Sequence, residues 1–129
     1  MTTMSRSSLR SLPSLLLAGA AALAGCKSAG MGPETRADIA AQLKLAEDPI
    51  QACYAKALQK NRRAKGVISL RFIAEASTGQ FKSINVLRDE PREPAITQCV
   101  VAEIGKLKLS KPTSSAVLID QPIRLTPNN

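Results

Sequence analysis

An uncharged apolar segment that leads to a cysteine constrains this chain more than any other feature. The run from Leu12 to Leu23 contains no charged residue, and two cations, Arg6 and Arg10, precede it. This pattern is typical of a secretory signal peptide. The alternative, a transmembrane anchor, is less favoured because a bilayer core requires roughly 20 apolar residues.

The apolar segment ends in Leu23, Ala24, Gly25 and Cys26, which is the residue order of a lipoprotein cleavage box. The small residues before Cys26 allow an extended backbone to enter a peptidase, and the thiol would receive a diacylglycerol. We therefore expect a signal peptide over residues 1–25 and attachment to membrane lipid through acylated Cys26. The residue after Cys26 is Lys27 and not Asp, which by analogy with the sorting rule for bacterial lipoproteins favours the outer membrane. We therefore expect a lipid-anchored protein of the cell envelope that faces the periplasm, on the outer membrane.

Removal of residues 1–25 leaves 104 residues, a length that suits one domain. We predict a lipid-attached tether over 26–36 and a domain over 37–129. The shortened chain carries 16 Lys and Arg against 10 Asp and Glu, and its basic residues are dispersed except in Lys60–Lys65. We expect that cluster to be a solvated loop beside a helix C-terminus, with no nucleic-acid partner.

Two cysteines remain in the expected domain, Cys53 and Cys99. An even pair in a compartment that permits disulfides favours a bond between them. The alternatives are two buried free thiols or half of a zinc site. Zinc is disfavoured because it needs four ligands and the chain has no His. We expect neither a metal nor a cofactor.

The composition also argues against an enzyme. Without His, the Ser-His-Asp and Cys-His nucleophile systems are excluded. The sequence contains no Ser-x-x-Lys, no GxGxxG and no P-loop. Asp89 and Glu90 are adjacent carboxylates, but they stand in a charged, proline-containing connection that is more typical of a solvated loop. We therefore predict no catalytic residue.

Apolar periodicity predicts an α+β fold, in which two helices pack on a small three-stranded antiparallel sheet in the order α-β-β-α-β. Helical spacing begins near Ile39, and Pro49 predicts a kink or a break before a main helix that ends near Asn61. Alternation predicts strands over 68–74 and 80–88, joined by a turn at 77–79. A second helix follows Pro94, and Pro122 predicts an edge position or a bulge for the last strand.

Several motifs together resemble the AgmX/PglI-type C-terminal domain, a family related to the C-terminal domain of TonB. They are Ile50, Cys53, Tyr54, Ala57, Leu58 and Asn61; then Gly66, Ile68, Leu70 and Phe72; then Gly79; then Cys99, Val100, Ile104 and Leu107; and last Pro122, Ile123 and Leu125. The resemblance covers about residues 37 to 125. It implies a TonB C-terminal-like fold and a disulfide between the two cysteines.

The resemblance also implies a binding mode, strand addition, in which an extended segment of a partner pairs with a sheet edge. The expected edge is the segment 116–125, with candidate partner-binding residues Val117, Ile119, Ile123 and Leu125. We expect a non-catalytic protein-binding or scaffold module with an envelope protein as its partner. Two alternatives stay open: the edge is blunted by Pro122 and Arg124 and binds nothing, or the chain is a purely structural subunit of an envelope transport or gliding-motility complex.

Overall fold

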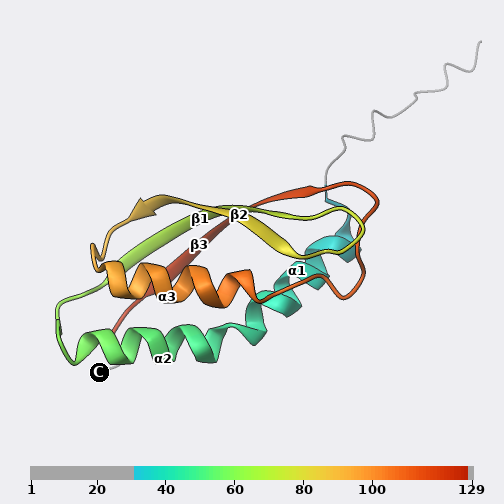
Figure 1. Ribbon diagram of the computed structural model, residues 1–129. Helices are drawn as coiled ribbons and strands as arrows, with labels where there is room; N and C mark the ends of the chain where they lie inside the picture. The colour runs from blue at the N-terminus through green and yellow to red at the C-terminus, as the bar shows by residue number, and fades with distance from the viewer. Residues whose placement is uncertain (1–30, 128–129) are drawn as a thin grey trace, which may run out of the picture.

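The structure, a computed structural model, describes residues 31–127, which form two layers. The elements in chain order are α1 (Pro33–Leu45), α2 (Glu47–Leu58), β1 (Gly66–Ala74), β2 (Phe81–Asp89), α3 (Pro94–Gly105) and β3 (Val117–Leu125). The strands form one antiparallel sheet in the order β2-β1-β3. Figure 1 shows the helices on one face of this sheet. The predicted fold class and element order are confirmed.

The N-terminal helix is bent, and the bend lies at Ala46 rather than at Pro49. Pro49 has no N–H for the carbonyl of Leu45, four residues earlier, and its ring crowds that carbonyl. The regular ladder therefore stops at Leu45 and restarts when the N–H of Ile50 donates to the carbonyl of Ala46 (2.9 Å). Pro49 itself is tolerated in the first turn of α2, where backbone N–H groups have no helical acceptor. The predicted break is confirmed, and α2 begins at Glu47, two residues before the predicted start near Pro49.

Helix α1 begins at Pro33, within the range predicted as tether. Pro33 occupies the first turn, and Glu34 follows it there, an arrangement that suits a helix N-terminus. The ordered body therefore starts four residues before the predicted boundary at 37. Within residues 31–127, no helix is both long enough and apolar enough to cross a bilayer.

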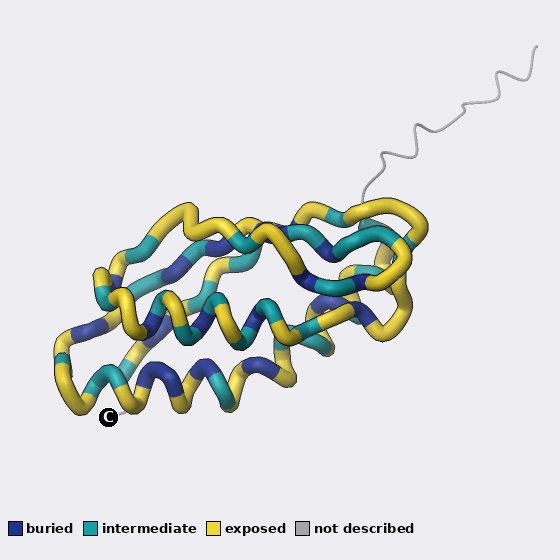
Figure 2. The backbone as a smooth tube through the Cα atoms, in the orientation of Figure 1, coloured by how far each residue is buried: buried dark blue, intermediate teal, exposed yellow. Residues whose placement is uncertain are grey.

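The core lies between the two layers. On β1 the predicted inward face is confirmed, because Ile68, Leu70, Phe72 and Ala74 are fully buried. Their neighbours from the helices include Ile50, Tyr54, Ile96, Val100 and Ile104. In Figure 2 the buried stretches of the strands and helices face one another. β1 is the central strand and carries the apolar ridge on which both helices pack.

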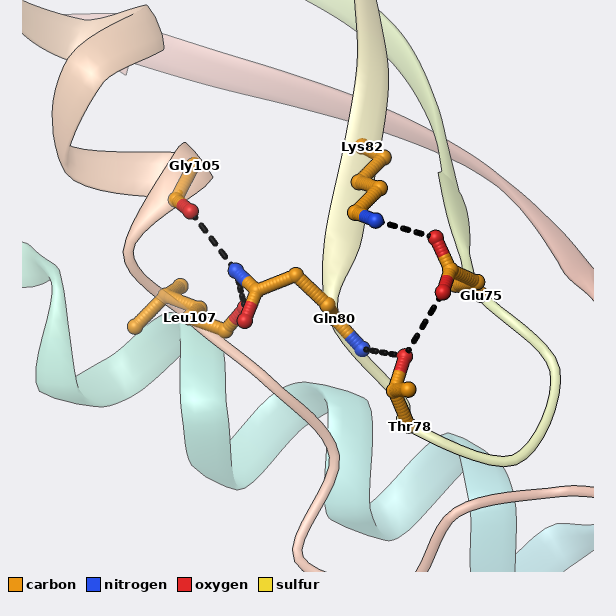
Figure 3. Close-up of polar contacts among 6 residues, drawn as sticks. All are labelled: Glu75, Thr78, Gln80, Lys82, Gly105 and Leu107. Atoms are coloured by element: carbon orange, nitrogen blue, oxygen red, sulfur yellow. Dashed lines mark hydrogen bonds and ion pairs between the residues drawn. The ribbon is translucent and has the colours of Figure 1, made fainter.

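Strand β2 is paired less regularly than β3. Its register against β1 shifts twice, between Ser69 and Leu70 and between Arg71 and Ile73, whereas β3 pairs with β1 without a shift. The start of β2 is tied to the end of α3 by Gln80, whose side-chain amide donates to the carbonyls of Gly105 (2.8 Å) and Leu107 (3.0 Å). Figure 3 shows this contact beside the turn that joins β1 to β2. Gln80 thereby satisfies carbonyls that a helix end leaves free.

Asp38 ties α1 to the loop that precedes β3. Its carboxylate accepts hydrogen bonds from the Ser110 N–H (3.2 Å), the Ser110 hydroxyl (2.7 Å) and the Lys111 N–H (2.9 Å). Burial raises the pKa of this carboxyl, but the hydrogen bonds outweigh it and leave the pKa below its ordinary value. Because these donors favour the ionised form, Asp38 stabilises the fold only while it is charged.

We expect Asp38→Asn to lower the free energy of unfolding by about 1–2 kcal/mol at pH 7, since several hydrogen bonds to a charged acceptor are weakened. The pKa of Asp38 is lower in the folded than in the unfolded protein. Its contribution is therefore complete above the unfolded value, about 3.9, and is lost as the pH falls through the folded value. Urea unfolding at pH 7 and at pH 2.5 should show a smaller difference between the two proteins in acid. An equal difference at both pH values would contradict this role.

Candidate functional site

A groove runs along α2 beside strand β3. It consists of three adjoining hollows of about 350, 340 and 320 Å³. Gln51 lines both the first and the second hollow, and Ala55 and Leu58 line both the second and the third. On the sheet side the wall is formed by residues 121–124 of β3 and then by Thr126 and Pro127. Because four consecutive β3 residues line it, the groove reaches the edge of the strand and not only its inner face.

The groove exists because the sheet is narrower than the helical layer. Two packed helices lie about 8–10 Å apart and are each about 10 Å wide. Three strands spaced about 4.8 Å apart are too narrow to cover them. In the described part of the chain, α2 packs closely against α3 and reaches the sheet through buried side chains such as Ile50 and Tyr54, which leaves its other flank uncovered. One further strand beside β3 would cover the exposed flank of α2.

The outer edge of β3 carries free backbone groups. Val67 of β1 directs its backbone toward the β2 side, because its carbonyl accepts from the Glu90 N–H (3.1 Å) and its N–H donates to the Glu90 carboxylate (3.2 Å). Alternate β1 residues from Ile68 onward therefore face β3. Their partners are the odd-numbered residues of β3. It follows that the even-numbered residues Leu118, Asp120 and Arg124 direct their N–H and carbonyl groups outward.

Pro122 weakens the middle of this edge. It is one of the outward-facing residues and has no N–H to donate. Its carbonyl already accepts a hydrogen bond from the Gln121 side-chain amide (2.9 Å). An added strand would therefore find donors at Leu118, Asp120 and Arg124 but none at Pro122. The predicted edge position of Pro122 is confirmed.

The four predicted partner-binding residues direct their side chains toward the core and not outward, although Ile123 also lines the first hollow of the groove. Ile119 and Leu125 are buried in the core, and Val117 and Ile123 are half-buried and packed against it. In a strand that covers a core, the apolar alternate residues point inward. The accessible side chains of β3 belong instead to the other face, where Leu118 is 57% exposed.

Charged groups lie on the outer face of β3 and in the groove. Arg71 of β1 forms a bidentate pair with Asp120 of β3 (2.6 and 2.8 Å), and hydrogen bonding to this guanidinium holds the pKa of Asp120 below its usual range. In the groove, Glu47 and Asp48 at the start of α2 lie across from Arg124 of β3. An occupant would therefore meet both signs of charge.

The predicted disulfide is present, since the Cys53 and Cys99 sulfur atoms lie at bonding distance with their Cα atoms 6.0 Å apart. It joins α2 to α3 on the side away from β3. Next to it, Tyr54 is buried, its hydroxyl donates to the carbonyl of Ala64 (2.5 Å), and burial raises its pKa. The predicted cleavage box Leu23–Cys26, with the lipidation site at Cys26, lies outside the described residues.

The adjacent carboxylates Asp89 and Glu90 both hold backbone. Asp89 accepts hydrogen bonds from the Arg92 N–H (3.0 Å) and the Thr97 hydroxyl (2.7 Å). Glu90 accepts from the Val67 N–H and pairs with Arg88 (2.7 Å). Between residues 31 and 127, no group of three or more Cys, Asp or Glu side chains is placed to bind a metal.

The groove was not anticipated from the sequence, although small and polar residues of α2 at four-residue spacing (Glu47, Gln51, Ala55 and Gln59) signal a helix face that is not covered. No family model, curated protein or solved structure matches this chain.

Proposed function

We propose that this chain is a lipid-anchored, non-catalytic protein-binding module of the bacterial cell envelope. Its binding site is the groove beside β3, where an extended segment of a partner protein adds as a fourth strand. The observation that carries this proposal is the coincidence of a free strand edge with a groove along an uncovered helix. In this mode, backbone hydrogen bonds supply affinity and the side chains on alternate positions supply selectivity.

The groove suits an extended segment because it is long and shallow. An added strand would lie about 4.8 Å from β3, and its inward side chains would fall on Gln51, Ala55 and Leu58 of α2. Outward N–H groups at Leu118, Asp120 and Arg124 would bind its carbonyls. The resemblance to the AgmX/PglI-type and TonB C-terminal domains, with the same α-β-β-α-β order, supports this mode.

The envelope location rests on the cleavage box and on the chain length that follows it. Six residues, 27–32, separate Cys26 from the start of α1. At a maximum of about 3.5 Å per residue they reach roughly 20 Å. Acylated Cys26 would thus keep the module close to its membrane, so its partner is a protein that presents an extended segment near that surface.

The edge can be tested with proline substitutions that remove one outward donor and leave the β1–β3 ladder intact. We expect Leu118→Pro to abolish a covalent adduct formed in the native bacterium by a photo-crosslinking residue placed at Arg124. Leu118→Ala is the matched control, because it shortens the same side chain and retains the N–H. It should preserve the adduct.

Pro122→Ala provides the opposite test, because it returns a donor to the middle of the edge. We expect this variant to increase the adduct yield several-fold, since a neutral hydrogen bond contributes about 1 kcal/mol. Mass spectrometry of the adduct identifies the partner peptide. If the adduct survives Leu118→Pro and is indifferent to Pro122→Ala, strand addition at β3 is wrong.

A further inference from the structure

One end of the fold carries most of the net positive charge of the described residues. This end contains the loop between α2 and β1, the loop between β2 and α3, and the chain segments beside them. We call it the cationic end. Its charged residues are Lys56, Lys60, Arg62, Arg63, Lys65, Arg88 and Arg92, against Asp89, Glu90 and Glu93. The net charge there is +4, whereas all of residues 31–127 together carry +5.

The cations at this end are largely without carboxylate partners. Among the described residues, a single ion pair forms at the cationic end, between Arg88 and Glu90. Asp89 and Glu93 are occupied by hydrogen bonds from Thr97 and Asn61. All four cations of the α2–β1 loop, Lys60, Arg62, Arg63 and Lys65, are exposed. Their charge is therefore available to an external anion.

The loop that carries these cations is held in place. The Asn61 side-chain amide donates to the Glu93 carboxylate (2.5 Å), and its oxygen accepts from the Arg63 N–H (3.1 Å). Ala64 is buried, and its carbonyl accepts the Tyr54 hydroxyl. These contacts fix the backbone on both sides of the basic residues, so little order has to be gained on binding.

The cationic end lies opposite the point where the chain enters the fold. Figure 1 shows the start of α1 at one end of the molecule and the loop after α2 at the other. Asp38 confirms the first placement, because it binds the loop before β3, far from the α2–β1 loop. The described chain therefore begins at the end of the molecule opposite the cationic end.

We infer that the cationic end is a docking surface for the anionic headgroups of a phospholipid bilayer other than the one reached by the N-terminus. The four loop cations are exposed within six consecutive residues, 60–65, which suits an extended anionic plane. A shallow hollow of about 290 Å³ between Lys56 and Lys60, walled by Ala57 and Ala95, offers room for a headgroup. The aromatic side chains of the described residues, Tyr54, Phe72 and Phe81, are all buried, so none can stack on a nucleic-acid base.

Vesicle binding tests this inference with residues 26–129 carrying Cys26→Ser, a chain that contains every helix, strand and core residue described above. We expect it to sediment with vesicles of phosphatidylcholine containing phosphatidylglycerol, and not with phosphatidylcholine alone. Substitution of Lys60, Arg62, Arg63 and Lys65 by Gln should weaken binding at least about 100-fold, because each cation near an anionic surface contributes about fivefold. Binding should also weaken as salt is raised.

A matched variant removes the same charge elsewhere. Arg36, Lys44, Lys108 and Lys111 are exposed and form no ion pair among the described residues, so their joint substitution by Gln is the control. It should bind the anionic vesicles within about threefold of the parent, and both variants should keep the parent's thermal unfolding. An equal loss of vesicle binding in the two variants would mean that net charge alone accounts for the binding, and this result would overturn the inference. Tighter binding to polyglutamate or to single-stranded RNA than to the vesicles would overturn the choice of a bilayer.

Discussion

Loss of the Cys53–Cys99 bond should lower the free energy of unfolding by about 4 kcal/mol, because the bond closes a long loop in the unfolded chain. The two cysteines are 46 residues apart, and the segment between them contains β1, β2, the end of α2 and the start of α3. A domain of this size has roughly 5–15 kcal/mol of stability in total. The bond also joins α2 to α3, so its loss would free the helix that forms the floor of the groove.

The measurement is urea unfolding of the double variant Cys53→Ser, Cys99→Ser beside the oxidised parent. Cys26→Ser is the control, since that residue precedes every described helix and strand in the chain and we expect its change to leave unfolding unaltered. Intact-mass spectrometry of the native protein should show the loss of two hydrogens from this pair and acyl chains on Cys26. A double variant as stable as the parent, or a native mass that corresponds to free thiols at both positions, would contradict the structural role of the bond.

Phe72→Ala should be comparably severe, with an expected loss of about 3–5 kcal/mol. Phe72 is fully buried on the central strand, and its ring packs against that of Phe81 with centroids 4.9 Å apart. Truncation removes this contact and leaves a cavity between the sheet and the helices, which a close-packed core fills only in part.

Thermal and urea unfolding report this loss, and Leu118→Ala supplies the comparison. Leu118 lies on the same sheet but is largely exposed, so we expect its truncation to change the stability by no more than about 0.5 kcal/mol. If the two substitutions had similar effects, or if Phe72→Ala cost less than about 1 kcal/mol, the two-layer core described here would be wrong.

The element order was predictable because each element carries its own periodicity. Alternation from Ile68 to Ala74 predicted an inward strand face, and all four of its apolar residues are buried. Pro94 predicted a helix start and stands at the start of α3. The bend in the first helix lies before Pro49 because a proline disturbs the carbonyl four residues before it, and Ala46 shows no signal of its own.

The placement of the predicted partner-binding residues could not be read from the sequence. Val117, Ile119, Ile123 and Leu125 were chosen because they are the apolar alternate residues of the last strand, but this same property places them against the core. Apolar alternation identifies the buried face of a strand and does not reveal which backbone groups remain unpaired. That depends on the neighbouring strand, which in this fold is β1 and not the strand preceding β3 in the chain.

From its own residues the chain determined its helices and strands, their order and a cysteine pair in the domain, because periodicity, proline positions and cysteine positions are local properties. Tertiary structure alone decided that a groove lies between α2 and β3, that Leu118, Asp120 and Arg124 direct free N–H groups outward, and that six unpaired cations share one end. These features depend on the distances between segments that are far apart in the sequence. Such distances are set by packing the whole core at once.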